Sequence, residues 1–192
     1  RKGSIVIGSD NLIANPGDKL YITMLAARVY WKEYVSGDHY DPSYIPRTFA
    51  TKAEVLAAGG SVEWKDDVAP TFKIALATKA LVKQPDGVVC GLFGVRIGEA
   101  DYAPVLWNTD KSAAQSVAPV IKSDMSFSLR KRGLHSGIYE LTTQNVKFSS
   151  GFSAYVPRIK LVGYHTDAEI KQILELFNAD ITSTVDISAT EV

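Results

Sequence analysis

The segment from Gly137 to Val162 constrains the fold most strongly, because it has the pattern of a β-hairpin. Residues 137–148 are rich in Ile, Tyr, Thr, Val and Phe, the residue types that strands prefer. Ser149-Ser150-Gly151 is a turn signal, and residues 152–162 form the second strand-like run. Pro157 has no N–H to donate, so we expect the second strand to lie at a sheet edge or to carry a bulge there.

The two hairpin strands are predicted to place cations and aromatic rings on one face. Successive strand residues point to opposite faces, so Tyr139 shares a face with Lys147, and Arg158 shares one with Lys160. One sheet face is therefore expected to be both basic and aromatic. The alternative is that the rings are core residues and the cations surround them. The second strand is expected to place Tyr155, Ile159 and Leu161 on one face and Ala154, Val156, Arg158, Lys160 and Val162 on the other.

The rest of the chain predicts further strands and a few short helices. Residues 19–31 and 71–83 have spacings compatible with a helix or a strand, and we interpret both as strands. Thr51 with Glu54, and Thr166 with Glu169, fit capping boxes that begin helices. Further strands are predicted at 88–97 and 102–107, and further helical residues at 52–58 and 110–123, the latter capped by Asp110 and kinked or ended early by Pro119.

These elements predict a mainly β (α+β) fold. Curved strands with glycine-marked bends suit a small barrel or sandwich, and we expect an OB-like β-barrel with short helical insertions and a C-terminal helix. Residues 1–180 are predicted to form this single domain, and residues 181–192 a flexible tail.

Charge is balanced overall but unevenly placed. The 192 residues have a formal net charge of zero, which argues against a strongly basic protein that coats duplex DNA. Residues 111–165 contain eight Lys or Arg and two acidic residues, an arrangement that indicates an anion-facing surface. The single cysteine, Cys90, excludes an internal disulfide framework and is expected to be a buried small hydrophobe. No run approaches the roughly 20 apolar residues of a membrane span, and no signal peptide is visible.

Catalytic motifs are missing from the sequence. His39 lies between Asp38 and Tyr40-Asp41, but no second histidine follows at a metal-ligand spacing. Ser136 is not part of a G-x-S-x-G motif, and no glycine-rich phosphate-binding fingerprint occurs. We therefore expect no catalytic activity, no metal and no cofactor.

Single-stranded nucleic acid is the partner that the sequence favours. A protein groove that binds a single strand needs cations to contact the phosphates and flat rings to stack on the bases. The cations are supplied by the run Arg130-Lys131-Arg132, and the rings by the aromatic-rich segment 31–49. The simpler alternatives are that the basic run is a solvated loop and that the rings of the segment pack onto the core. The predicted contact residues are Trp31, Tyr34, Tyr44, Arg47, Lys73, Lys79, Trp107, Lys122, Arg130, Lys131, Arg132, Tyr139, Lys147, Phe148, Phe152, Tyr155, Arg158 and Lys160.

The runs GIYELTTQNVKF (137–148) and YVPRIKLVGYHT (155–166) resemble the C-terminal half of bacteriophage-encoded single-stranded DNA-binding proteins of the OB-fold type. The resemblance extends over about residues 72–166 and is a loose pattern. It implies a protein that coats single-stranded DNA, with RNA as a further ligand to test, during phage replication or recombination in the cytoplasm of an infected bacterium. It also implies no strong sequence preference, and homo-oligomers or replication proteins as partners.

One feature departs from that family. Many of its members end in an acidic tail that recruits partners, whereas residues 180–192 contain only Asp180, Asp186 and Glu191 as acids. The main alternative is a viral structural or assembly protein of β-sandwich type that acts through self-association. A third is an enzyme domain that uses an OB-like part as a substrate platform.

Overall fold

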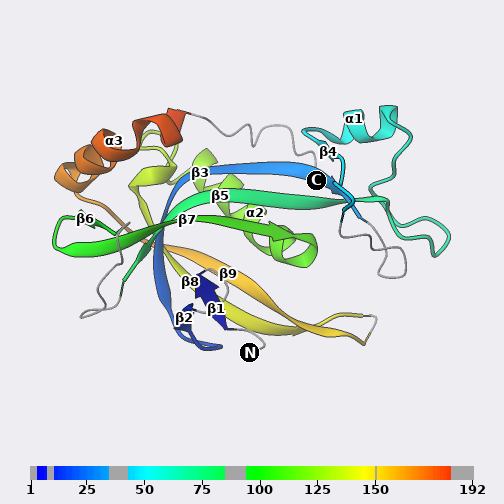
Figure 1. Ribbon diagram of the computed structural model, residues 1–192, viewed down its shortest axis with the longest axis horizontal. Coiled ribbons are helices and arrows are strands. Elements are labelled where there is room, and N and C mark those ends of the chain that lie inside the picture. The colour runs from blue at the N-terminus through cyan, green and yellow to red at the C-terminus, as the bar shows by residue number, and fades with distance from the viewer. Residues whose placement is uncertain (1–3, 8–10, 35–42, 85–93, 150, 183–192) are drawn as a thin grey trace.

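A twisted antiparallel sheet forms the body of the protein. The computed structural model describes residues 4–7, 11–34, 43–84, 94–149 and 151–182 (Figure 1). The strands are β1 (Ile5–Ile7), β2 (Asn11–Ala14), β3 (Leu20–Glu33), β4 (Thr48–Phe49), β5 (Phe72–Lys83), β6 (Val95–Ile97), β7 (Ala100–Asp110), β8 (Gly137–Lys147) and β9 (Ser153–Tyr164). The helices are α1 (Lys52–Ala57), α2 (Lys111–Ser126) and α3 (Asp167–Thr182), with a short 3-10 turn, η2, at Leu134–Ser136.

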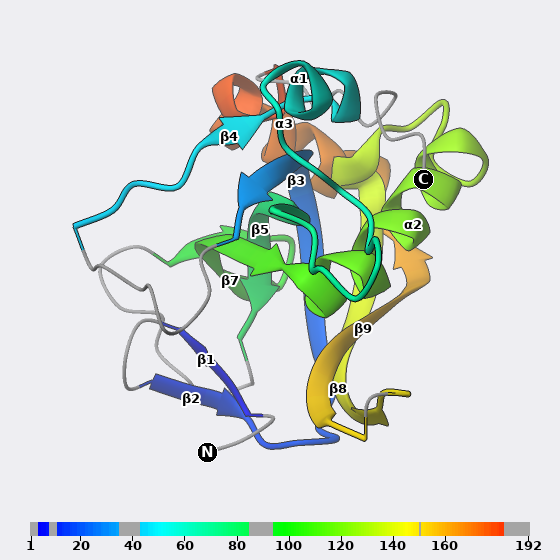
Figure 2. The same cartoon turned by 90° about the vertical axis from the view of Figure 1, so that its right-hand side faces the viewer.

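The strand order in the main sheet is β6-β7-β5-β3-β8-β9, and β4 adds to the far end of β3. β3 is the central strand. Its first residues, Leu20–Ile22, pair with β8, and the stretch from Ile22 to Glu33 pairs with β5. The two halves of the sheet therefore diverge from the start of β3, as Figure 2 shows. The prediction of a mainly β fold is confirmed by these strands. The described strands do not close into a ring, so a closed barrel is not confirmed.

Each face of the sheet has a hydrophobic core and a helix. On β3, Met24 belongs to the core that includes Val117 and Ile121 of α2, whereas its neighbour Leu25 belongs to the core that includes Ile173 of α3. Consecutive strand residues point to opposite faces, so a strand covered on both faces is apolar at nearly every position. That requirement explains the continuous burial of residues 22–27.

The local signals of the sequence are largely confirmed. Residues 19–31 and 71–83 form β3 and β5, and both capping boxes are present, at Thr51 with Glu54 and at Thr166 with Glu169. The predicted strand at 102–107 is longer, as β7. Of the predicted strand at 88–97, β6 is described, while residues 88–93, with Cys90, lie outside the described residues.

Of the two effects predicted for Pro119, a kink or an early end of the helix, the early end is wrong. α2 continues to Ser126, because the stripe of Ala114, Val117, Ala118 and Ile121 on its inner face is buried on both sides of the proline. The proline itself faces outward. Asp110 is at the expected N-cap position but makes no side-chain capping hydrogen bond.

The β8–β9 hairpin is confirmed, and β9 is an edge strand of the main sheet as Pro157 predicted. The register is continuous at Pro157, which pairs with Thr143, and the bulge lies instead between Ile138 and Tyr139. Among the described helices, none is long and apolar enough to cross a membrane.

The predicted basic and aromatic face of the hairpin needs correction. Tyr139 is fully buried and pairs with Leu161, while Lys160 pairs with Glu140. Residues paired directly across two strands share a face, so the cations of β9 lie on the face opposite Tyr139. The predicted alternation along β9 is confirmed from Ala154 to Leu161 by the continuous register, and each face has one buried residue there, Val156 on the face of the cations and Ile159 on the face of Tyr139.

Candidate functional site

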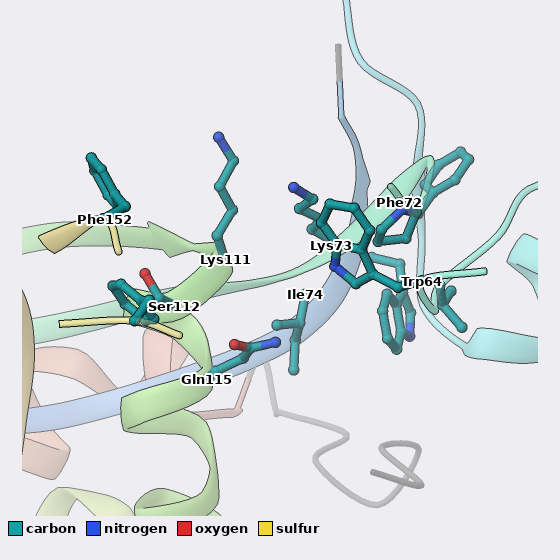
Figure 3. A pocket seen from close by; sticks show the side chains of 12 residues that line it. Trp64, Phe72, Lys73, Ile74, Lys111, Ser112, Gln115 and Phe152 are labelled. Atoms are coloured by element: carbon teal, nitrogen blue, oxygen red, sulfur yellow. The ribbon is translucent and has the colours of Figure 1, made fainter. Parts of the chain in front are cut away.

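An open cleft of about 440 Å³ lies where the end of β3 and the start of β5 meet the first turn of α2 (Figure 3). The loop between α1 and β5 and the turn between β8 and β9 complete it. We call it the aromatic cleft. Its lining residues are Trp31, Val62, Trp64, Pro70, Phe72, Lys73, Ile74, Lys111, Ser112, Gln115, Phe148 and Phe152.

The rings of the aromatic cleft fall into a buried base and an exposed rim. Phe72 is fully buried and packs against Phe49, with ring centroids 5.3 Å apart. Trp64 and Phe152 are 68% and 66% exposed. Phe148 stacks on Phe152, with centroids 6.3 Å apart and an interplanar angle of 18°. Large exposed rings around a cavity are unusual for a surface with no ligand, so the rim is the part of the cleft suited to contact one.

Gly60 allows the loop after α1 to approach the base of the cleft. A Cβ at this position would lie 2.8 Å from the Phe72 ring and 2.8 Å from Val55. Side-chain atoms do not approach so closely, so any larger residue would push the loop off Phe72. The loop that carries Trp64 therefore depends on a glycine for its position.

Two lysines of the aromatic cleft share one tyrosine ring. The Nζ atoms of Lys73 and Lys111 lie 3.6 Å and 4.3 Å from the centroid of the Tyr34 ring. Burial lowers the pKa of Lys73, and the positive charge of Lys111 lowers it further, while Asp110 opposes the shift. Within the part of the chain that the structure describes, no ion pair joins either lysine to a carboxylate. Two adjacent ammonium groups that lack such a partner are suited to attract an anion.

The position of Lys111 follows from a sharp strand-to-helix junction. β7 ends at Asp110 and α2 begins at Lys111, so there is no connecting loop. Lys111 has a φ of +53°, in the left-handed region that side-chain-bearing residues rarely adopt. This conformation places the lysine beside Lys73, and Figure 3 shows both between Phe152 on one side and Trp64 on the other.

Arg47 and Tyr44, predicted to contact nucleic acid, are both bonded to Glu33. The Arg47 guanidinium donates to both carboxylate oxygens, at 2.7 Å from Nη2 and 3.0 Å from Nε, and the Tyr44 hydroxyl donates to the same carboxylate. The hydrogen bond from Arg47 is the main reason that the pKa of Glu33 is lowered to about 2. The pair ties residues 44–47 to the end of β3, so the charge of Arg47 is balanced within the protein.

Of the predicted contact residues, the aromatic cleft brings together four: Trp31, Lys73, Phe148 and Phe152. Tyr34 lies beside it under the two lysines. The Arg130–Arg132 turn follows the other end of α2, about 24 Å from its start by the helical rise. There Arg132 lies 5.4 Å above the Tyr164 ring.

The other predicted residues are dispersed over the structure. Lys79 pairs with Asp180 at 2.8 Å, and Arg158 donates to Gln144 at 3.0 Å. Trp107 is half-buried against the core, and Tyr139 is inside it, which rules out base stacking by Tyr139 in this structure. The exposed residues Lys122, Lys147, Tyr155 and Lys160 do not line the aromatic cleft.

The sequence did not identify Trp64, Phe72, Lys111 and Gln115 as parts of a site. Only Trp64 carried a usable signal, since a tryptophan in an acidic, glycine-flanked loop has no strand or helix to pack it. Lys111 is indistinguishable in sequence from any lysine of a first helical turn.

A buried Thr23–His165–Glu169 chain is the arrangement that most resembles catalytic machinery. His165 Nε2 is 2.7 Å from Thr23 Oγ1, and its Nδ1 is 3.5 Å from Glu169 Oε2. However, Thr23 is fully buried and His165 is 3% exposed, so no substrate reaches the hydroxyl. These contacts instead connect the start of α3 to β3. The described residues contain no group of three His, Cys, Asp or Glu that could hold a metal, and His39 lies outside them.

Stability is expected to fall as the pH is lowered from 7 to 5 because of His165. Burial lowers its pKa, so below about pH 6.5 the unfolded chain takes up a proton that the folded protein resists, at up to about 1.4 kcal/mol per pH unit for one group. Urea unfolding across this pH range should show the decline, and His165→Asn should flatten it. His135→Asn should remove a separate part of the decline, because burial also lowers the pKa of His135. An equal slope in wild type and His165→Asn would contradict the assignment.

No protein-family model, curated protein or solved structure matches this chain.

Proposed function

We propose that the protein binds single-stranded DNA in the aromatic cleft, without catalysis and without strong sequence preference. The observation that carries the proposal is the meeting of exposed rings, Trp64 and Phe152, with the Lys73–Lys111 pair in one open cleft. Rings that stack on bases and cations that neutralise phosphates are the two requirements of a single-strand groove.

The connectivity supports an OB-like framework for this site. β3, β5 and β7 form a meander, α2 follows, and the β8–β9 hairpin returns to pair with β3. We propose a half-open barrel of this type, in which α2 contacts both β7 and β9 across the opening. Ser116 of α2 donates to the carbonyl of Pro157 on β9 at 2.7 Å, which satisfies part of that strand's outer edge.

The loops provide a second line of support. In OB-folds, oligonucleotides bind beside the loops that follow the first and fourth barrel strands. The corresponding segments here are residues 34–71, between β3 and β5, and residues 148–152, between β8 and β9. The first contributes Val62, Trp64 and Pro70 to the aromatic cleft, and the second contributes Phe148 and Phe152. The site that the geometry defines and the site that this connectivity favours coincide.

The mechanism follows from the chemistry of these groups. Every base has a flat π-face, so stacking on Trp64 and Phe152 contributes roughly 1–3 kcal/mol per base whatever the sequence. Lys73 and Lys111 replace the counterions of phosphates, which makes binding weaken with salt. The resemblance of the hairpin to phage single-stranded DNA-binding proteins supports a role in coating single strands during phage replication or recombination.

Tryptophan fluorescence titration with a thymidine oligonucleotide tests the proposal. Trp31 and Trp64 line the cleft, so binding should quench their emission, while Trp107→Phe removes the tryptophan outside it. Duplex DNA should give little response, and a uridine oligonucleotide measures the preference for DNA. No quenching even at low salt would refute the proposal, and stable oligomers without nucleic-acid affinity would favour an assembly protein.

The salt dependence identifies the cations. For single strands, log K falls by about 0.7 per log unit of salt for each phosphate contact. Lys73→Ala/Lys111→Ala should therefore reduce the slope by about 1.4 and weaken binding at low salt. The triple variant Arg130→Ala/Lys131→Ala/Arg132→Ala is the matched control, because these cations lie outside the cleft. A larger loss of slope in the triple variant would move the phosphate path to the basic turn.

A further inference from the structure

A second cavity continues from the aromatic cleft along α2. It has a volume of about 620 Å³ and shares Ile74 and Gln115 with the cleft. Its own residues include Ala118, Pro119, Lys122 and Phe127. We call it the α2 trough. Because the two cavities have two residues in common, a chain bound in the cleft can pass into the trough without leaving the protein surface.

The direction of the α2 trough follows from helical spacing. Gln115, Lys122 and Ser126 are spaced by seven and then four residues, so they share one face of α2. Lys111, at the cleft, is four residues before Gln115 and about 16 Å from Lys122 along the axis. One helix face thus carries a lysine at the cleft and another farther along the trough.

Phe127 closes the far end of the α2 trough and is 80% exposed. It immediately follows α2, whose last residue is Ser126. A phenylalanine this exposed leaves a whole ring face available, which is the uncommon arrangement for this residue type. The trough therefore repeats the composition of the cleft, with an apolar floor, a lysine and an exposed ring.

We propose that the α2 trough is a second subsite for the same DNA single strand, in which Phe127 stacks on a base and Lys122 contacts a phosphate. This inference rests on the proposed function of the aromatic cleft. Continuity with the cleft and the lysine on the same helix face favour nucleic acid over an apolar peptide as the occupant. The affinity should then rise in two steps with oligonucleotide length, within the roughly 4–16 nucleotides that one OB-fold covers.

Binding of thymidine oligonucleotides of about 4 and about 14 nucleotides, near the two ends of the OB-fold range, separates the two subsites. Lys122→Ala/Phe127→Ala should weaken binding of the long oligonucleotide about 5- to 100-fold and leave the short one unchanged. Tyr155→Ala/Lys171→Ala is the matched control, because it removes an exposed ring and an exposed cation that line neither cavity. In a Phe127→Trp variant, the new indole should be quenched by the long oligonucleotide and not by the short one.

The outcomes separate this inference from the function on which it rests. If wild type binds both lengths and Lys122→Ala/Phe127→Ala loses no affinity for the long one, the trough is not part of the path and the cleft proposal stands. An equal loss for both lengths also overturns the second subsite, since the variant would then act on the cleft. If wild type binds neither length, both proposals fail.

Discussion

Replacing Trp64 and Phe152 together by alanine is expected to weaken binding of single-stranded DNA at least 30-fold. Each ring offers one stacking contact of roughly 1–3 kcal/mol, so the loss of two amounts to about 2–6 kcal/mol. Both side chains are about two-thirds exposed, at 68% and 66%. The truncations therefore remove little buried surface, and the free energy of unfolding should change by less than about 1 kcal/mol. Loss of affinity with retained stability is the combination that identifies a contact residue.

The affinity should be measured by the fluorescence anisotropy of a labelled thymidine oligonucleotide, because the variant lacks one of the tryptophans. Tyr155→Ala is the matched control. Tyr155 is 40% exposed on β9, and it is not part of the aromatic cleft. A loss in Tyr155→Ala as large as in the double variant would place the binding surface on the outer strand of the hairpin, where the sequence pattern had suggested it.

The strands and helix starts of this fold could be predicted because their signals are local. A capping box needs only Thr166 and Glu169, three residues apart, and both of its hydrogen bonds are present. The continuously buried run of β3 at residues 22–27, apolar except for Thr23, likewise reflects burial on both faces, which needs no knowledge of the partners. Local signals were less reliable in α2, where Asp110 makes no capping hydrogen bond and Pro119 does not end the helix.

The site could be predicted only in part because its residues meet through tertiary contacts. Trp64 and Phe152 are 88 positions apart, and two loops bring them to one cleft. The sequence predicted Arg47 as a phosphate contact. In the structure its guanidinium donates hydrogen bonds to both carboxylate oxygens of Glu33, fourteen residues earlier. A cation's availability depends on which carboxylate reaches it, and composition alone does not contain that information.

Tyr139 shows that the role of an aromatic residue is also hard to predict from sequence. Rings that stack on bases and rings that fill a core are the same residue types. The sequence predicted which residues of β8 share a face with Tyr139, but it did not show that α2 covers that face. In the structure Tyr139 pairs with Ile22 on one side and Leu161 on the other, so it joins β3 to β9 through β8. Burial raises the pKa of its hydroxyl, and the neighbouring Asp124 carboxylate adds to the shift.

Replacing Tyr139 by alanine is consequently expected to lower stability more than any other change considered. Truncation of a fully buried aromatic ring costs about 3–5 kcal/mol, which for a chain of this length lowers the midpoint of thermal unfolding by roughly 6–20 °C. Circular dichroism melting curves measure the effect. Tyr139→Phe is the matched control, because it keeps the ring in the core and should retain most of the stability.

The same variant separates a core role from a binding role. At a temperature where Tyr139→Ala remains folded, its affinity for a thymidine oligonucleotide should equal that of wild type, since the ring lies on the core face and not in the aromatic cleft. A variant that melts like wild type but binds DNA weakly would show that Tyr139 contacts bases. That result would require β8 to expose its inner face on binding, because Ile22, Leu141 and Ile159 are buried in the same core as the ring.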